Sequence, residues 1–270
     1  MTHDSSAKAR IARTYAAASD HFDTLPFWHH FGRRTIERLS LAPGARVLDL
    51  CCGTGASALV AAEIVGPGGH VLGVDLSREL IAVARAKAMA SGLGNIDFRV
   101  ADVESLRLEP ASFDAVVSVF GLFFIDDMAA MLQRAWDWLR PGGRLAVTTW
   151  GRKVLDPGES LFWDAVAKED ESIQSVSASE RLADPEAVAA LFVEAGAPAP
   201  IVSPETWDMP IATPEAFWPV ILGTSNRAAF DALPDDARAR VRAFVIETLR
   251  ARRVTSLRCD VIYAVASRLP

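Results

Sequence analysis

Residues 47–57, with the sequence VLDLCCGTGAS, carry the pattern in this chain that is best suited to ligand chemistry. The apolar residues at its start, with Asp49 among them, predict a short strand that is buried on both faces and ends at a turn. Gly53 and Gly55 follow, and glycine allows positive φ angles and a close approach of backbone N–H groups to a ligand. Residues 56–65 are helix-forming. The pattern predicts a strand, a glycine-rich turn and a helix that bind a nucleotide-like cofactor.

Two carboxylates bear on which cofactor this turn binds. The turn alone also fits the G-x-G-x-x-[GA] pattern of NAD enzymes, or a tight turn without a ligand. Asp75 closes the apolar run 70–75, twenty residues after Gly55, where a carboxylate can bind both hydroxyls of a ribose. Asp49 would repel an anionic pyrophosphate beside the turn, whereas it would attract a cationic amino or sulfonium group. The two residues together favour a cofactor that carries a positive charge.

Composition limits the class of protein and its partners. The chain has 270 residues, half of them apolar, which is enough for one large core and an appendage. Its net charge is −6, from 28 basic and 34 acidic residues, without a long basic run, so nucleic acid is not an expected partner. The uncharged, largely apolar stretch 115–125 is far shorter than the roughly 18–20 residues that span a bilayer. Since residues 1–10 also lack an apolar signal core, we expect a cytoplasmic protein without membrane insertion.

Strand and helix patterns alternate along the chain and predict a parallel sheet with right-handed crossovers. Expected strands cover 46–50, 70–75, 96–100, 113–119, 144–150 and a stretch near 200–208. Expected helices cover 57–65, 77–91 with Ser77 as N-cap, 126–139, 159–171 and 185–195. The Arg-Pro-Gly-Gly sequence at 140–143 predicts a turn before the fifth strand.

Four motifs in order and spacing resemble the class I S-adenosylmethionine-dependent methyltransferases. They are VLDLCCGTG with Asp75, Ala101-Asp102-Val103, FDAVVSVFGLFFIDD at 113–127 and LRPGGRLAV at 139–147. The chain is similar, over residues 10–150, to the small-molecule group that includes the ubiquinone/menaquinone C-methyltransferases. The resemblance implies an α/β fold with a Rossmann-like, seven-stranded, mostly parallel sheet and an antiparallel last strand. The alternating run within 258–267 is the candidate for that last strand.

The resemblance also implies that the cofactor is S-adenosyl-L-methionine and which residues bind it. They all lie at or just after the carboxyl ends of expected strands: Asp49, Cys51, Gly53, Gly55, Asp75, Leu76, Asp102, Val103, Val119 and Phe120. The two glycines would lie under the methionine part, Asp49 would order its amino end and Asp75 would hold the ribose. Asp102 and the Val103 backbone would bind the adenine, while the Val119 and Phe120 carbonyls would face the methionine ammonium. In an open α/β sheet, ligands bind at this carboxyl edge.

The N-terminal segment 1–42 is rich in aromatic residues and histidines, and we interpret it as a helical lid. A plain brace is the alternative. We expect Tyr15, Phe22, Trp28 and Phe124 to bind the acceptor. If the acceptor is a phenol or an enol, His29 or His30 is the candidate general base, although a structural histidine explains either residue equally well.

The C-terminal half departs from the family pattern. We expect the methyltransferase core to comprise 43–208 and 254–270, with 209–253 inserted as a helical cap whose second helix covers 235–251. A cap would suit an apolar acceptor of metabolite size. A homodimer face is the alternative role for these helices, and the two roles are compatible.

The three cysteines cannot form a disulfide framework. Cys51 and Cys52 are adjacent in the turn, and Cys259 is more than two hundred residues away. We interpret them as small buried side chains in a reducing compartment, with a metal or arsenical thiolate site as the alternative and no metal expected.

The functional hypothesis is a methyltransferase that moves a methyl group in line from sulfonium to a small, apolar or aromatic metabolite, on oxygen or carbon. An NAD(P)-dependent oxidoreductase shares the glycine turn and Asp75, but Asp49 and Asp102 disfavour it, as does the lack of a Tyr-x-x-x-Lys pair. A non-catalytic cofactor-binding regulator would keep the same acids and turn.

Overall fold

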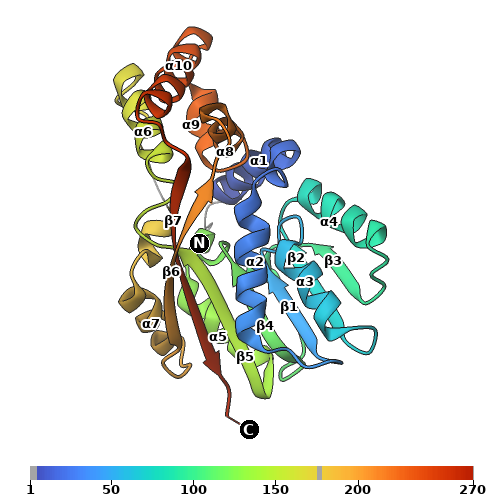
Figure 1. Cartoon of the computed structure of the whole chain (residues 1–270). Helices are drawn as coiled ribbons and strands as arrows, with labels where there is room; N and C mark the ends of the chain where they lie inside the picture. The colour runs from blue at the N-terminus through green and yellow to red at the C-terminus, as the bar shows by residue number, and fades with distance from the viewer. Residues whose placement is uncertain (1–4, 175–177, 270) are drawn as a thin grey trace. The chain divides into compact units, whose positions relative to one another are not determined.

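The computed structural model describes residues 5–174 and 178–269, and these form two compact units (Figure 1). The sheet unit comprises residues 27–152, 178–205 and 261–269, and the helical unit comprises residues 5–26, 153–174 and 206–260. The expected lid, core and cap divide the chain differently, because the boundary falls between the two N-terminal helices and not at residue 42.

One seven-stranded sheet organises the fold, in the order β3-β2-β1-β4-β5-β7-β6. The strands are β1 (Arg46–Leu50), β2 (His70–Asp75), β3 (Ile96–Val100), β4 (Phe113–Val119), β5 (Leu139–Trp150), β6 (Ile201–Pro210) and β7 (Ser256–Ser267). The first five strands are parallel to one another, and β7 is antiparallel to β5. The expected fold class is confirmed.

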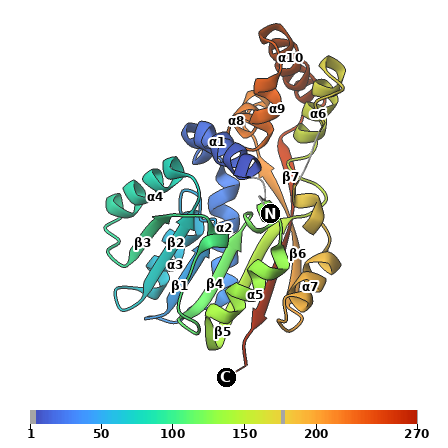
Figure 2. The same cartoon turned by 180° about the vertical axis from the view of Figure 1, so that it is seen from behind.

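Helices cover both faces of the sheet unit (Figures 1 and 2). One face carries α2 (Pro26–Leu39), α3 (Ala56–Val65) and α4 (Arg78–Ala90), and the other carries α5 (Met128–Trp138) and α7 (Pro185–Glu194). The short helices η1 (Val103–Ser105), η2 (Leu122–Phe124) and η3 (Ala178–Leu182) lie in its connections. Ser77 is the predicted N-cap of α4, since its side chain accepts a hydrogen bond from the Leu80 N–H.

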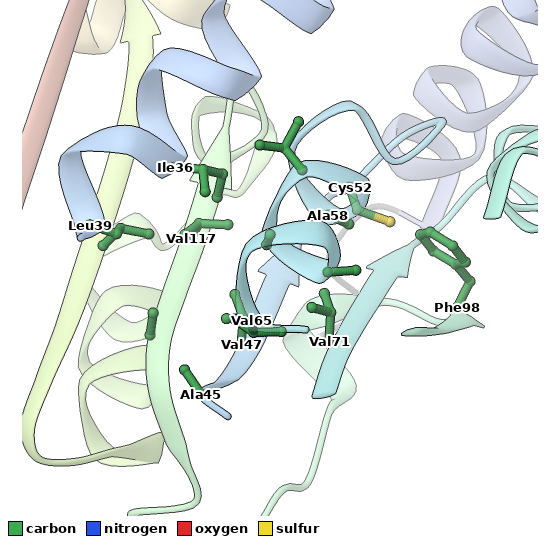
Figure 3. Close-up of a cluster of buried hydrophobic side chains, with 14 of the residues drawn as sticks. Ile36, Leu39, Ala45, Val47, Cys52, Ala58, Val65, Val71, Phe98 and Val117 are labelled. Atoms are coloured by element: carbon green, nitrogen blue, oxygen red, sulfur yellow. The ribbon is translucent and has the colours of Figure 1, made fainter. Parts of the chain in front are cut away.

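The core between the sheet and these helices is built from small and β-branched side chains (Figure 3). Val47, Val71 and Val117 come from three adjacent strands, and each is fully buried. Ile36 and Leu39 of α2 pack on the same cluster, although α2 precedes the first strand. This helix is therefore part of the permanent core of the sheet unit.

The helical unit packs α1 (Ser5–Phe22) with elements from the C-terminal half. These are α6 (Gly158–Glu169), η4 (Pro214–Phe217), α8 (Trp218–Leu222), α9 (Asn226–Ala232) and α10 (Asp235–Ala251). Two glycines allow close packing: a Cβ on Gly158 would lie 2.5 Å from the Phe217 ring, and one on Gly223 would lie 2.7 Å from Leu25. The Arg227 guanidinium donates to the Ala17 carbonyl and ties α9 to α1.

The prediction of a turn at 140–143 is wrong. β5 begins at Leu139, and its register against β4 shifts between Phe113 and Ala115. Gly142 has a φ of 80°, so the Pro-Gly-Gly residues form an irregularity inside the strand instead of ending the preceding helix. In the described part of the chain, no helix is both long and apolar enough to span a bilayer.

Candidate active site

The glycine-rich turn that follows β1 has a backbone conformation that most residues avoid. Cys51, Gly53 and Gly55 have φ angles of 59°, 55° and 82°. The Cys52 N–H donates to the Val74 carbonyl at 3.0 Å, which ties the turn to β2. A Cβ on Gly55 would lie 3.0 Å from the Phe98 ring, so both space and backbone conformation favour glycine there.

Asp49 is a buried acid, and one of its carboxylate oxygens has no hydrogen-bond partner among the described residues. Its side chain is 1% exposed, and its Oδ2 accepts a 2.6 Å hydrogen bond from Ser57 Oγ in the first turn of α3. Its Oδ1 is also buried and has no hydrogen-bond partner among the described residues. Burial raises the pKa of Asp49 to about 7, and the nearby charge of Asp75 adds to the rise. A cationic ligand group beside Oδ1 would relieve this desolvation.

Asp75 holds the turn and the next helix together. Its Oδ2 accepts from the Gly53 N–H at 2.8 Å, and its Oδ1 accepts from the Ser77 N–H at 2.8 Å. Burial raises its pKa, while these two backbone hydrogen bonds act in the opposite direction. Each oxygen keeps a lone pair for a ligand hydroxyl. The next residue, Leu76, is 39% exposed and is available to pack on a ligand.

The loop after β3 is preformed. Asp102 caps η1, since its Oδ1 accepts from the Glu104 N–H at 2.9 Å, and Val103 is buried. Arg134 of α5 donates to the backbone carbonyls of Glu104 and Leu106 and holds this loop in place.

A second unusual turn follows β4, beside the first. Phe120 has a φ of 55°, and its N–H donates to the Thr148 carbonyl at 2.9 Å. A Cβ on Gly121 would lie 2.3 Å from the Cys51 Cβ, so the turns after β1 and β4 are in contact. Left-handed non-glycine residues cost free energy and cluster at functional sites. Val119 is half-buried at the end of the strand.

An aromatic cluster supports this second turn. The Phe120 ring stacks on Trp150 at 4.1 Å, and Phe31 of α2 makes edge contacts with both rings, at 5.7 and 5.8 Å. Trp28 lies 5.7 Å from Phe120 and Phe27 lies 5.6 Å from Trp150. Sequence reasoning missed Trp150, although an aromatic residue at the carboxyl end of a predicted strand was the available signal.

The two candidate histidines are placed differently from one another. His29 is exposed. His30 Nε2 lies 3.9 Å from Glu205 Oε1 of the edge strand β6, and burial lowers the His30 pKa although Glu205 opposes the shift. Arg34 and Arg38 also donate to Glu205, at 3.2 and 2.8 Å. His30 thus lies beside an arginine–glutamate network, and a catalytic role for either histidine stays a prediction.

The candidate acceptor-binding residues divide between the two units. Tyr15 and Phe22 make an edge contact at 6.1 Å in α1 of the helical unit. Trp28 and Phe124 belong to the sheet unit, where the half-buried Phe124 packs against Phe123 at 4.7 Å.

The two adjacent cysteines point toward different neighbours of β1: Cys52 lies beside β2, and Cys51 lies beside the turn after β4. A Cβ on Gly73 of β2 would lie 3.0 Å from Cys52 Sγ, whose sulfur points toward Phe98 in Figure 3. A Cβ on Gly121, after β4, would lie 3.1 Å from Cys51 Sγ. Burial raises the pKa of both thiols, which disfavours thiolate chemistry. Within the described residues, no cluster of three His, Cys, Asp or Glu side chains could hold a metal ion.

Comparison with known proteins decides between the functional hypotheses. A methyltransferase domain family matches residues 47–143. The aklanonic acid methyltransferase of Streptomyces sp. (strain C5) is 37% identical over 148 residues, which cover 54% of this chain and 67% of that protein. The chain is a class I S-adenosylmethionine-dependent methyltransferase. The oxidoreductase hypothesis is not favoured.

Other relatives of the methyltransferase confirm the small-molecule group. The demethylmenaquinone methyltransferase of Anoxybacillus flavithermus is 32% identical over 58% of this chain and 69% of its own length. The nocamycin O-methyltransferase of Saccharothrix syringae is 28% identical over 90% of this chain and 89% of its own. Among solved structures, the YcgJ protein of Bacillus subtilis has a TM-score of 0.59 at 20% identity, over 90% of this chain and 99% of that chain, and so shares the fold.

The chemistry of the site fits the family's methyl donor, S-adenosylmethionine. This molecule has an ammonium and a sulfonium, and the site has a buried carboxylate oxygen without a partner, on Asp49. S-adenosylmethionine also has ribose hydroxyls, and Asp75 offers a carboxylate for them at the end of the adjacent strand. The methyltransferase therefore presents suitable donor and acceptor groups at the ends of adjacent strands.

Proposed function

We propose that this methyltransferase methylates an oxygen atom of a small, apolar or aromatic metabolite. The alignment with the nocamycin O-methyltransferase carries the proposal, because it extends through both compact units, whereas the alignment with the aklanonic acid enzyme covers 54% of the chain. Acceptor recognition in this fold depends on additions to the sheet, and those additions are within the longer alignment. Carbon methylation is the competing outcome.

In this proposal the cofactor lies across the carboxyl ends of β1, β2, β3 and β4. Asp49 would accept from the methionine ammonium, and Asp75 would accept from the ribose hydroxyls. Asp102 and Val103 would bind the adenine, and the carbonyls of Val119 and Phe120 would face the ammonium. Support comes from the two unusual turns, which direct backbone groups of adjacent strands to the same edge.

When bound, the cofactor would supply an electrophilic methyl group, which the acceptor oxygen would take as the sulfonium leaves as a neutral thioether. The chain's task is to align the acceptor and to exclude water, so that the change in charge is not screened. The cluster of Trp28, Phe31, Phe120 and Trp150 is suited to a dry wall. The acceptor's proton leaves to a base, and we propose His29 or His30 for that role, worth about 10²–10⁴ in rate.

We further propose a cytoplasmic enzyme and a homodimer as its assembly. All three cysteines are free, and two are buried, which supports a reducing compartment. Val193 of α7 and Ile201 of β6 are 59% and 77% exposed, and they support an apolar contact with a second copy. Analytical ultracentrifugation tests the assembly: a monomer at all concentrations would exclude it.

The acceptor atom is tested with a cofactor whose methyl carbon is ¹³C. The enzyme is incubated with a panel of small phenols, hydroquinones and aromatic acids, and the product methyl group is identified by NMR. We expect an O-methyl signal with at least one acceptor, and less product from the Asp75→Ala control when the cofactor concentration is close to the dissociation constant of the wild type. A C-methyl signal would contradict the assignment of oxygen, and no transfer to any acceptor in the panel would contradict the acceptor class.

A further inference from the structure

A groove of about 810 Å³ lies along β3 in the sheet unit. Its size is within the range of small-molecule sites, which is roughly 300–1,000 Å³. Its lining residues come from α4, from β3, from the starts of β1, β2 and β4 and from residues 108, 109 and 112 before β4. Figure 1 shows where these elements lie in the sheet unit. Of the lining residues, Phe98 also packs against Gly55 of the cofactor turn. The charged residues of the groove have no role in the methyl transfer described above.

The charge of the groove is opposite to that of the whole chain. Four arginines line it, together with two carboxylates, so its net charge is about +2 with His70 neutral, whereas the chain carries −6. His70 is held by Asp97, with Nε2 3.0 Å from Asp97 Oδ2. A basic groove on an acidic protein favours an anionic ligand.

Three of the four arginines have side-chain N–H groups that are available to bind a ligand. The side chains of Arg78 and Arg99 make no hydrogen bond or ion pair with the residues that the structure describes, and both are exposed. Arg85 is two turns after Arg78 on α4, and its Nη2 donates to the Phe98 carbonyl at 2.6 Å. That carbonyl is on the outer edge of β3, so Arg85 is fixed in place with its other N–H groups unused. A fixed guanidinium loses little entropy when it binds an oxyanion.

The groove also has apolar side chains in its lining, on both sides of the edge strand β3. Leu72, Val100 and Leu108 are only half-buried, and all three line it. Val100 packs against the core cluster beside α3 and α4, whereas Leu72 alternates along β2 with Val71 of that cluster and so faces the opposite side of the sheet. Apolar side chains beside guanidinium groups suit a molecule with an apolar body and an anionic head.

We infer that this groove is a second ligand site, which binds a phosphate ester with an apolar body through Arg78, Arg85 and Arg99. Guanidinium groups match the oxygens of a phosphate in bidentate geometry, and several arginines suit a group with more than one negative charge. A soluble metabolite and a lipid headgroup share this chemistry. The site is independent of the cofactor turn and of the acceptor.

The test is calorimetric titration of the full-length protein with inorganic pyrophosphate at low ionic strength. We expect stoichiometric binding that saturating S-adenosylhomocysteine does not displace, and an affinity at least about tenfold lower in Arg78→Gln/Arg99→Gln, since each lost charge-assisted hydrogen bond is worth about that factor. Arg252→Gln, which removes an exposed arginine of the helical unit, is the matched control and should bind like the wild type.

Vesicles then distinguish the two sources of the phosphate. The site would be assigned to a lipid headgroup if the wild type binds phosphatidylglycerol vesicles but not phosphatidylcholine vesicles, and if the double variant loses this binding. If the wild type binds pyrophosphate but neither kind of vesicle, the site would be assigned to a soluble phosphate ester. The inference is overturned if the wild type does not bind pyrophosphate, if the double variant binds it equally well, or if S-adenosylhomocysteine displaces it. Cofactor affinity should be the same in all three proteins, so failure here leaves the methyltransferase assignment intact.

Discussion

At the scale of single residues, the proposed preference of the turn for a positively charged cofactor rests on Asp49. Its carboxyl group is buried and receives one hydroxyl hydrogen bond, and the other oxygen has no partner among the described residues. The cost of this arrangement appears in its pKa of about 7, well above the ordinary value of 3.8. A ligand cation beside Asp49 would stabilise its charged form, and this stabilisation would add to the affinity for the ligand.

The Asp49→Asn variant should be more stable than the wild type without ligand at pH 8. The folded protein binds a proton at Asp49 more tightly than the unfolded chain does, so this group costs stability as pH rises from about 4 to about 7. We expect a gain of roughly 2–4 kcal/mol at pH 8 that shrinks towards pH 4. Urea unfolding across this range measures it, and a difference that does not vary with pH would contradict the raised pKa.

The Asp75→Ala variant should weaken S-adenosylhomocysteine binding by about 1–3 kcal/mol, because the ribose loses a charged acceptor. Stability should also fall, since the N–H groups of Gly53 and Ser77 lose their acceptors. Calorimetry and circular dichroism measure the two effects, with Asp126→Ala, an exposed acid, as the control. An unchanged dissociation constant in a folded variant would remove Asp75 from the site.

At the scale of elements, the positions of strands could be predicted because buried strands are continuous apolar runs between turn residues. The ranges 46–50, 96–100 and 113–119 match β1, β3 and β4. Their carboxyl ends bring Asp49, Asp75 and Asp102 to one edge, as the alternation of strands and helices predicts.

Other parts of the site had no local signal. The left-handed Phe120 could not be predicted, because its conformation is imposed by the contact of Gly121 with Cys51 and by stacking on Trp150. The hydrogen bond from Ser57 to Asp49 and the contact of His30 with Glu205 join residues whose positions depend on packing. Tertiary contacts of this kind override local propensity.

Gly32 is the position where α2 meets the first turn of α3. A Cβ there would lie 3.1 Å from the Ser57 N–H nitrogen and 3.2 Å from the Ala56 carbonyl carbon. We expect Gly32→Ala to cost about 1–3 kcal/mol of stability and to weaken cofactor binding, because the displaced turn carries the hydroxyl that holds Asp49. Gly94→Ala, which would meet open space, is the control. Equal stability and affinity in both variants would show that α2 does not constrain the turn.

At the scale of the whole molecule, the chain divides into two units that share the strands β6 and β7. The N-terminal segment belongs to both, since α1 packs with α8 and α9 while α2 is buried on the sheet. The expected lid over 1–42 thus combines helices in two different environments. The proposal of a lid applies to α1, and a bracing role suits α2.

Hydrogen exchange distinguishes these roles. Amides of α2 should exchange slowly with and without S-adenosylhomocysteine, because its residues Phe27, Phe31 and Ile36 are at most 1% exposed. Amides of α1 should exchange faster without ligand and slow when it is added. Protection of α1 that is the same in both states would exclude a ligand-dependent lid.

The central claim is that the buried carboxylate of Asp49 makes the turn after β1 the site for a cationic cofactor. The most direct test is the number of protons released when S-adenosylhomocysteine binds, measured by calorimetry at pH 7 in buffers with different ionisation enthalpies. Because the free protein holds Asp49 half-protonated near this pH and a ligand ammonium favours the charged form, the wild type should release about half a proton. Asp49→Asn should release close to none and bind more weakly. Equal proton release by the two proteins, with equal affinity, would contradict the claim.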